Sequence, residues 1–298
     1  MKLAAAERYI RNSLESIYPT NEAVIMADML LEHFTSFSKG DRLTNKEADL
    51  TQDQEVAIHK GVERLLKHEP IQYIMNKCWF YGMELFVDPS VLIPRPETEE
   101  LVAWIINDVR SSGYNVFSRG TADADETDLL KILDVGTGSG CIALALKKAM
   151  PQAEVWGCDL SEEALNVARR NGSALDIRVD FQGLNFLDQL QQKQLPTVNI
   201  LVSNPPYIPI RDKDLMNKNV VEHEPHTALF VPDEDPLIFY RALAKFASSR
   251  LHENGSIYME IHEDLGNDVV RLFSDEGYNK IELRKDMQQK NRMVKVSK

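Results

Sequence analysis

Ile132-Leu133-Asp134-Val135-Gly136-Thr137-Gly138-Ser139-Gly140 is an apolar run that passes directly into a glycine-rich turn. The pattern predicts a β-strand over 131–135 and a helix over 139–149. Glycines at such a turn let the backbone approach a ligand and place helix N-terminal amides beside it. The spacing is GxGxG, which is neither the dinucleotide GxGxxG nor a P-loop with its lysine. The stretch predicts a ligand site at residues 136–140; a glycine-rich turn without a ligand is the alternative.

Strand and helix patterns alternate from Leu129 to the end of the chain. Further strands are predicted at 154–158, 178–182, 198–202, 256–261, 279–284 and 292–297. Further helices are predicted at 161–171, 236–250 and 264–275, with Ser161 as an N-cap and Gly172 beyond the helix end. This alternation favours an α/β fold with a mostly parallel, doubly wound sheet. The last two strands are expected to form an antiparallel hairpin at its edge.

The chain before the glycine-rich turn has a different character. Helical spacing of apolar residues predicts an all-helical domain over 1–77, with a helix over 21–37 and a turn at 39–41. Thr44-x-x-Glu47 and Thr51-x-x-Gln54 both match capping boxes. Aromatic and branched residues then predict a β-hairpin linker over 78–95. The third domain, 96–298, is expected to open with a helix from Pro96 to about residue 110, followed by a polar surface loop over 111–128.

Asp159 follows the second predicted strand of the alternating region, about twenty residues after the glycine-rich turn. A carboxylate at that place can accept both ribose hydroxyls of an adenosine moiety. An aspartate that caps the next helix is the structural alternative. The preceding glycine-rich turn, at the right separation, favours the ligand-binding interpretation.

Asn204-Pro205-Pro206-Tyr207 follows the predicted strand at 198–202. Asn-Pro and Pro-Pro both favour plain turns. However, ligands of open α/β sheets bind at the carboxyl ends of central strands. The Asn204 side-chain oxygen and the Pro205 carbonyl can each accept one N–H from a planar amino group, and Tyr207 can lie against that group. The motif therefore predicts a site for an NH2 group.

Bulk composition excludes several classes of protein. The chain of 298 residues has a formal net charge of -12, and residues 1–78 hold 10 Lys plus Arg against 12 Asp plus Glu. Phosphate binding relies on basic residues, so this balance counts against nucleic acid as a partner. No apolar run is long enough to span a bilayer, and the N-terminus does not resemble a secretory signal. Three scattered cysteines suggest neither disulfides nor a metal site, so a cytoplasmic protein is expected, monomeric by default.

Together, the glycine-rich turn, Asp159 and the NPPY motif resemble class I amino methyltransferases. The stretches Phe86–Glu100 (FVDPSVLIPRPETEE) and His68–Tyr73 (HEPIQY) are similar to the HemK/PrmC family, the peptide chain release factor glutamine methyltransferases. The resemblance covers residues from about 20 to the C-terminus. It implies a Rossmann-like class I fold with a seven-stranded, mostly parallel sheet. It also implies methylation of a glutamine side-chain amide in a release factor. The composition, as given above, predicts no membrane partner and no direct nucleic-acid partner.

The resemblance also assigns residues to roles. The cofactor S-adenosylmethionine is implied at Gly136, Thr137, Gly138, Ser139, Gly140, Asp159, Asn185, Phe186 and Asn204. The target glutamine is implied to contact Asn204, Pro205, Pro206, Tyr207 and Arg95. The helical domain would help to dock the release factor.

Three positions depart from the family pattern. Asn76 stands where the family often has glycine, Asn185 where it commonly has aspartate, and residues 286–292 lack a usual glycine. Asn185 is expected to weaken adenine binding without abolishing it, since an asparagine oxygen can still accept from an amino group.

Three rival interpretations stay open. An amino-group methyltransferase acting on a ribosomal protein or nucleic acid would bind its target with the same NPPY motif, because a nucleobase NH2 is also planar. An inactive binding scaffold is opposed by the intact motifs. A nicotinamide oxidoreductase would leave the NPPY motif unexplained.

Overall fold

The computed structural model describes residues 1–112 and 129–298. These residues form two compact units, one of Met1–Lys77 with Asn217–His223 and the other of Cys78–Met216 with Glu224–Lys298. In the described ranges, no helix has the length and apolar character needed to cross a membrane. The predicted division into domains at 1–77, 78–95 and 96–298 stays a prediction.

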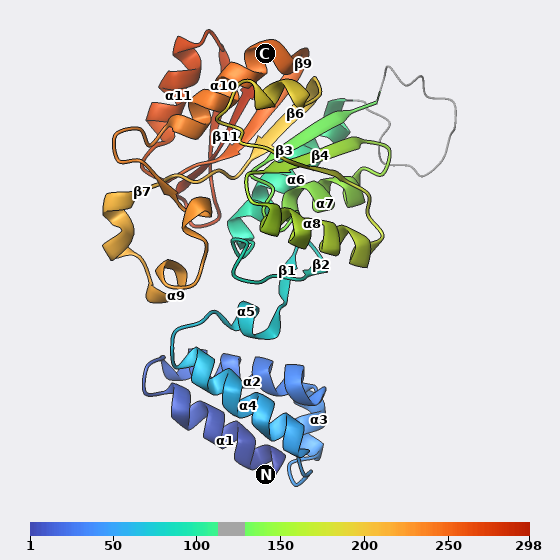
Figure 1. The fold of residues 1–298 in the computed structure, drawn as a ribbon, viewed down its shortest axis with the longest axis vertical. Helices are drawn as coiled ribbons and strands as arrows, with labels where there is room; N and C mark the ends of the chain where they lie inside the picture. Colours follow the sequence, from blue (N-terminus) through green and yellow to red (C-terminus); the bar gives the residue numbers. More distant parts are fainter. Residues whose placement is uncertain (113–128) are drawn as a thin grey trace. The chain divides into compact units, whose positions relative to one another are not determined.

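The first unit is a helical bundle (Figure 1). Its helices are α1 (Leu3–Leu14), α2 (Thr20–Thr35), α3 (Lys39–Thr44), α4 (Gln52–Leu65), α5 (Ile71–Met75) and the short α9 (Lys218–Val221). Leu3, Ile10 and Leu14 recur on one buried face of α1, as their helical spacing predicts. They pack with the apolar faces of α2 and α4 into a separate small core.

Local chemistry explains where these helices begin and end. Thr51 and Gln54 form the predicted capping box at the start of α4. The box predicted at Thr44 is wrong, because the Thr44 hydroxyl donates back to the Asp41 carbonyl and closes α3. Ser38 and Asp41 form the capping box there, so the predicted turn at 39–41 is a short helix. Asn76 ends α5 in the left-handed conformation (φ 52°), which asparagine tolerates.

The second unit is built on a seven-stranded sheet. Its strands are β3 (Lys131–Val135), β4 (Glu154–Asp159), β5 (Asp180–Gly183), β6 (Val198–Ser203), β9 (Leu251–Glu260), β10 (Lys280–Lys285) and β11 (Asn291–Ser297). The strand order is β10-β11-β9-β6-β3-β4-β5, and only the pairings of β11 are antiparallel. This confirms the predicted mostly parallel sheet with a terminal hairpin. From β3 the chain winds outward through β4 and β5, then returns to β6 on the other side.

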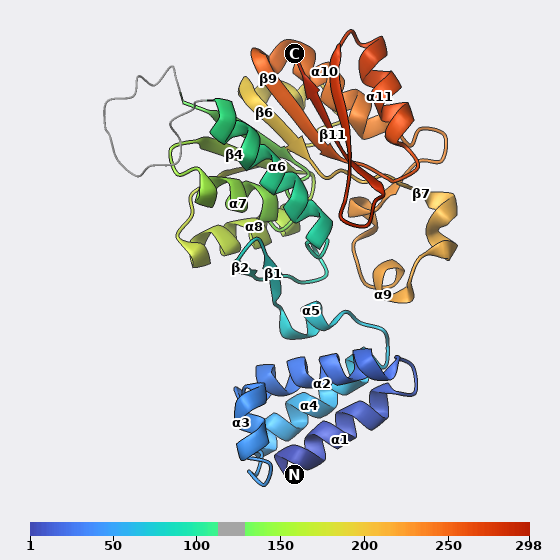
Figure 2. The same cartoon turned by 180° about the vertical axis from the view of Figure 1, so that it is seen from behind.

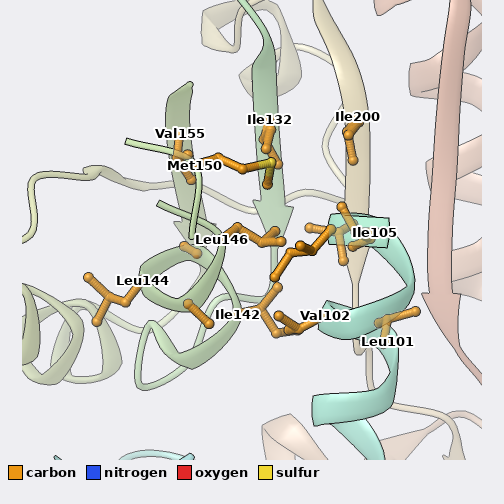
Figure 3. Close-up of a cluster of buried hydrophobic side chains, with 14 of the residues drawn as sticks. Leu101, Val102, Ile105, Ile132, Ile142, Leu144, Leu146, Met150, Val155 and Ile200 are labelled. Atoms are coloured by element: carbon orange, nitrogen blue, oxygen red, sulfur yellow. The ribbon is translucent and has the colours of Figure 1, made fainter. Parts of the chain in front are cut away.

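Helices cover both faces of the sheet (Figures 1 and 2). One face carries α6 (Pro96–Ser112), α7 (Cys141–Ala149) and α8 (Glu162–Leu175), and the other carries α10 (Ile238–Arg250) and α11 (Gly266–Asp275). Successive strand residues alternate between the two resulting cores: Ile132 lies in one and Leu133 in the other. Figure 3 shows Ile132, Val155 and Ile200 from the strands meeting side chains of α6 and α7. Burial on both faces explains why the central strands read as continuous apolar runs.

The remaining elements are short. A hairpin of β1 (Cys78–Phe80) and β2 (Met83–Leu85) precedes α6, as the aromatic stretch predicts. The strands β7 (Ile208–Pro209) and β8 (Phe230–Val231) pair in parallel beyond the NPPY motif. Short 3-10 helices lie at Gln191–Gln194, Ile210–Leu215 and His226–Ala228.

Three further sequence expectations concern this unit, and their outcomes differ. Ser161 caps α8 as predicted, with its hydroxyl accepting from the Ala164 amide. Gly172 is not beyond the helix end, because α8 continues to Leu175 and Asp176 takes the left-handed terminal position. A side chain at 172 would lie 2.9 Å from the Ile177 carbonyl, so tight packing accounts for this glycine. Of the loop predicted over 111–128, residues 111 and 112 end α6, and the rest lies outside the described residues.

Candidate functional site

A cavity of about 510 Å3 lies at the carboxyl ends of β3, β4 and β6. The chain changes winding direction between β3 and β6, and such switch points are where open α/β sheets bind ligands. The cavity is lined by Ser90, Val91, Leu92, Val135, Gly136, Gly138, Cys158, Asp159, Leu160, Ser161, Glu163, Ala164, Leu184, Asn185, Phe186, Leu187, Ser203, Asn204, Pro205, Pro206, Pro225, Thr227, Ala228 and Phe239. Eight of these are among the site residues predicted from sequence: Gly136, Gly138, Asp159, Asn185, Phe186, Asn204, Pro205 and Pro206.

The glycine-rich turn brings bare backbone to the cavity wall. Gly136 and Gly138 have positive φ angles of 71° and 53°. A Cβ at either glycine would have no atom within 4 Å, so the space beside the backbone is open. The amides of Gly136 and Thr137 both donate to the Cys158 carbonyl, at 2.9 and 3.0 Å, and this fixes the turn against β4. The turn is therefore shaped for close approach of a ligand.

The other members of this motif face inward. The Thr137 hydroxyl donates to Asp134 Oδ2 at 2.7 Å, and the Ala143 amide donates to the same oxygen at 3.2 Å. Burial raises the pKa of Asp134 to about 7. Ser139 is buried, and a Cβ at Gly140 would lie 3.1 Å from Ala168. None of Thr137, Ser139 and Gly140 lines the cavity, so they contribute to the shape of the turn.

Asp159 ends β4 beside this turn. Its Oδ2 accepts from the Gly138 amide at 2.9 Å and its Oδ1 from the Ser161 amide at 3.0 Å. Burial raises the pKa of this carboxyl group. The Leu160 amide also donates to this carboxylate. A carboxylate has about four acceptor sites, so acceptor capacity is still left. The two interpretations of Asp159 are thus compatible: it caps the following turn and could also receive a vicinal diol.

Asn185 and Phe186 follow β5 and form another part of the wall. The Phe186 ring is buried and packs on Phe246, with 5.4 Å between ring centroids. Asn185 Oδ1 accepts from the Leu187 amide at 3.0 Å. One acceptor position of this oxygen is therefore used by the turn, and a second lone pair is left for a ligand.

Asn204 directly follows β6, and its side chain is held by a hydrogen bond to Thr98. Its Nδ2 donates to Thr98 Oγ1 at 3.1 Å, and the Thr98 hydroxyl donates to Glu260 Oε2 at 2.6 Å. Glu260 is the last residue of β9, the strand next to β6. Sequence reasoning quoted Thr98 only within the FVDPSVLIPRPETEE stretch and missed Glu260. A carboxylate at the end of an apolar strand was the available signal.

Tyr207 and Arg95 lie outside the cavity lining. The Tyr207 hydroxyl donates to Glu260 Oε1 at 3.3 Å, and its ring meets His262 edge-on at 5.9 Å. Arg95 forms a salt bridge of 2.5 Å with the buried carboxylate of Glu224, which also accepts from the Ile93 amide at 3.2 Å. This contact joins the 90–95 segment to the 224–228 segment, and both contribute residues to the cavity wall.

Comparison with known proteins finds relatives that share one description. A family model described as the PrmC N-terminal domain matches residues 5–75, and one described as the methyltransferase small domain matches 114–226. The release factor glutamine methyltransferase of Flavobacterium psychrophilum is 36% identical over 285 residues, covering 96% of this chain and 95% of the relative. That of Bacteroides thetaiotaomicron is 37% identical over 292 residues, covering 97% and 98%. That of Streptococcus pneumoniae is 40% identical over 247 residues, covering 83% and 81%.

One solved structure supports the fold. The hMettl16 catalytic domain, crystallised in complex with MAT2A 3'UTR hairpin 6, superposes with a TM-score of 0.52. It is 13% identical in sequence, and the match covers 82% of this chain and 80% of that one. At this identity the likeness is one of fold alone.

Proposed function

This chain belongs to the PrmC/HemK family of release factor glutamine methyltransferases, and we propose that it methylates a glutamine side-chain amide nitrogen in a peptide chain release factor. The methyl donor in this proposal is S-adenosylmethionine. The observation that carries the proposal is the Asn204 amide at the cavity wall, whose Nδ2 is engaged by Thr98. That bond leaves the Asn204 oxygen as the side-chain atom that can accept an N–H.

The residues that line the cavity support binding of the donor. Open backbone at Gly136 and Gly138 would admit the methionine end, and the remaining acceptor positions of Asp159 would receive the ribose hydroxyls. Asn185 and Phe186 would face the adenine. When bound, the donor would supply an activated methyl group on a sulfonium. Its transfer to the amide nitrogen would leave S-adenosylhomocysteine and release one amide proton to solvent.

The residues of the NPPY motif would align the target nitrogen. An amide nitrogen is a poor nucleophile because its lone pair is delocalised into the carbonyl. Acceptors at the Asn204 side chain and the Pro205 carbonyl would hold both amide hydrogens and direct the lone pair toward the methyl carbon. They would also stabilise the positive charge that grows on nitrogen. Because the donor is already activated, alignment is sufficient and a dedicated strong base is not required before attack.

Two further assignments belong to the proposal. The helical N-terminal unit would help to dock the release factor, and Arg95 would order the cavity wall near the target glutamine through its salt bridge with Glu224. An amino-group methyltransferase acting on a ribosomal protein or a nucleic acid is the competing assignment. The net charge of -12 favours a protein substrate over a nucleic acid.

The test is a transfer assay with labelled S-adenosylmethionine. Purified release factor, ribosomal protein and nucleic acid are offered side by side, and the labelled product is analysed by mass spectrometry. A methylated glutamine in the release factor is the expected result. Label in nucleic acid alone would show that the NPPY motif holds a base.

Variants of Asn204 test the site itself. Asn204→Ala should lower turnover by roughly 100- to 1,000-fold, the usual cost of losing one positioned polar group at a reacting centre. Cofactor affinity should weaken only partly. Asn107→Ala, at an exposed position on α6, is the matched control and should behave as wild type. Near-normal turnover of Asn204→Ala would contradict the proposed role.

A further inference from the structure

We propose that Glu260 is a positioning residue for methyl transfer, acting through the Thr98 hydroxyl to fix which end of the Asn204 amide faces the target. This inference rests on the proposed function and adds two residues to it. Neither residue lines the cavity. Their effect on the reaction would pass entirely through Asn204 and Tyr207.

The geometry is a continuous chain of hydrogen bonds across three elements. Asn204, after β6, donates to Thr98 on α6, and Thr98 donates to Glu260 at the end of β9, over 3.1 and 2.6 Å. Thr98 and Glu260 are each 2% exposed. Water therefore cannot readily replace either partner. The direction in which each hydrogen bond of this series is donated then depends on these groups alone.

The number of protons on each group fixes which group donates and which accepts. A threonine hydroxyl has one proton to donate, and an ionised carboxylate can only accept. Thr98 must therefore give its proton to Glu260, and its oxygen can only accept from Asn204. The group of Asn204 that faces Thr98 must then be the NH2. The Asn204 oxygen is left to accept an N–H from the target amide, which is the orientation that transfer requires.

Protonation of Glu260 would remove this constraint. A protonated carboxyl group could donate to Thr98, and Thr98 could then donate to the Asn204 oxygen. The Asn204 amide would turn its NH2 toward the target amide, whose own hydrogens also need acceptors. The two donors would oppose each other, and the target nitrogen would lose its alignment.

The groups around Glu260 act on this equilibrium in both directions. Burial raises the pKa of Glu260, and the charge of Glu97 raises it further, whereas hydrogen bonds from Thr98 and Tyr207 and the nearby Arg292 lower it. The Tyr240 hydroxyl donates to the Glu260 backbone carbonyl at 3.2 Å. The Tyr207 bond, at 3.3 Å, ties the last residue of the NPPY motif to the same carboxylate that orients its first residue.

Substitutions at Thr98 test the chain directly. In Thr98→Val the shape is kept and the hydroxyl is lost, so kcat should fall about tenfold, as expected for one orienting hydrogen bond to a buried polar group. The Kd for S-adenosylmethionine should stay within about twofold, since Asn204 is the only cofactor-site residue perturbed. Thr98→Ser keeps the hydroxyl and should return kcat to within about threefold of wild type. Thr35→Val, which removes a buried hydroxyl bonded to the Leu31 carbonyl in the other unit, controls for general destabilisation.

A pH profile separates positioning from structural support. Wild-type kcat should fall on the acid side as Glu260 takes up a proton, and this acid limb should be much reduced in Thr98→Val. If Thr98→Val does not fold, Glu260→Gln serves instead, because its amide can offer Thr98 either a donor or an acceptor and cannot fix which group donates. It should lose the acid limb and several-fold in kcat.

The outcomes are distinct. A wild-type protein that leaves the release factor unmethylated overturns the proposed function. An active wild type whose folded Thr98→Val variant keeps kcat and the acid limb overturns the positioning role alone. Equal losses in Thr98→Ser and Thr98→Val would also overturn it, because the hydroxyl would then not be the relevant group.

Discussion

Removal of the Asp159 carboxylate is the most direct test of the cofactor site. Its two oxygens already accept from the Gly138 and Ser161 amides, at 2.9 and 3.0 Å. The carboxylate also accepts from the Leu160 amide, and the acceptor capacity that is left would receive the two ribose hydroxyls. Hydrogen bonds to a charged group contribute about 1.5–3 kcal/mol each, so Asp159→Ala should lose about 3–6 kcal/mol of binding free energy. At about 1.4 kcal/mol per tenfold, this weakens S-adenosylmethionine binding by roughly 100- to 10,000-fold.

Isothermal titration calorimetry gives the Kd, and a thermal melt checks that each variant is folded. Asp180→Asn, which removes an exposed charge on the neighbouring strand β5, is the matched control and should bind as wild type. The pKa of Asp159 is raised by burial, and the binding form is the ionised one. Wild-type affinity should therefore fall as the pH is lowered through that raised pKa, and Asp159→Ala should lose this dependence. Binding by folded Asp159→Ala within about threefold of wild type would refute the reasoning.

Three predictions concern stability, each measured by urea unfolding. Gly157→Ala places a Cβ 2.8 Å from a ring carbon of Phe181 and should lower the free energy of unfolding by about 1–3 kcal/mol. The control is Gly40→Ala, whose nearest atom is 3.8 Å away, and it should be near neutral. Equal effects of the two substitutions would argue against the clash. Thr51→Ala removes a capping box and should cost about 1 kcal/mol, and an unchanged midpoint for the helical unit would contradict that. Asp134 has a pKa of about 7, above its unfolded value, so the native state binds the extra proton and stability falls as the pH rises from about 4 to about 7. The free energy of unfolding of Asp134→Asn should therefore rise relative to that of wild type over that pH interval in the ligand-free protein. A difference between the two that stays constant with pH would count against the raised pKa.

The local signals in the sequence were sufficient for most of the fold. Short continuous apolar runs and period-3.6 patterns reflect which side chains each element buries, and they located the central strands and the helices between them. The carboxyl ends of parallel strands meet at one edge of a sheet, so Asp159 and Asn204 could be expected near the glycine-rich turn. The cavity brings these three features together.

Predictions failed where local patterns had two readings. Thr44-x-x-Glu47 fits a capping box, yet Thr44 bonds backward to Asp41 and ends a helix. Gly172 fits a helix terminus, yet it lies inside α8, where close packing against the Ile177 carbonyl leaves little room for a side chain. Helix ends depend on which of several competing hydrogen bonds forms, and a short motif does not decide that.

The sequence by itself determined the sheet, the glycine-rich turn, and the residue types that meet at the strand ends, because each follows from contacts between near neighbours or from the rule that parallel strands share an edge. Only the tertiary structure decided how those residues are held. Thr98 and Glu260 are 162 positions apart, and Arg95 and Glu224 are 129 apart. No periodicity in the chain encodes such pairs. The first depends on how α6 packs against β9, and the second on how the segment before α6 meets the segment before β8. The orientation of the Asn204 amide belongs to this second class, because it is set by a buried proton arrangement that exists only in the folded protein.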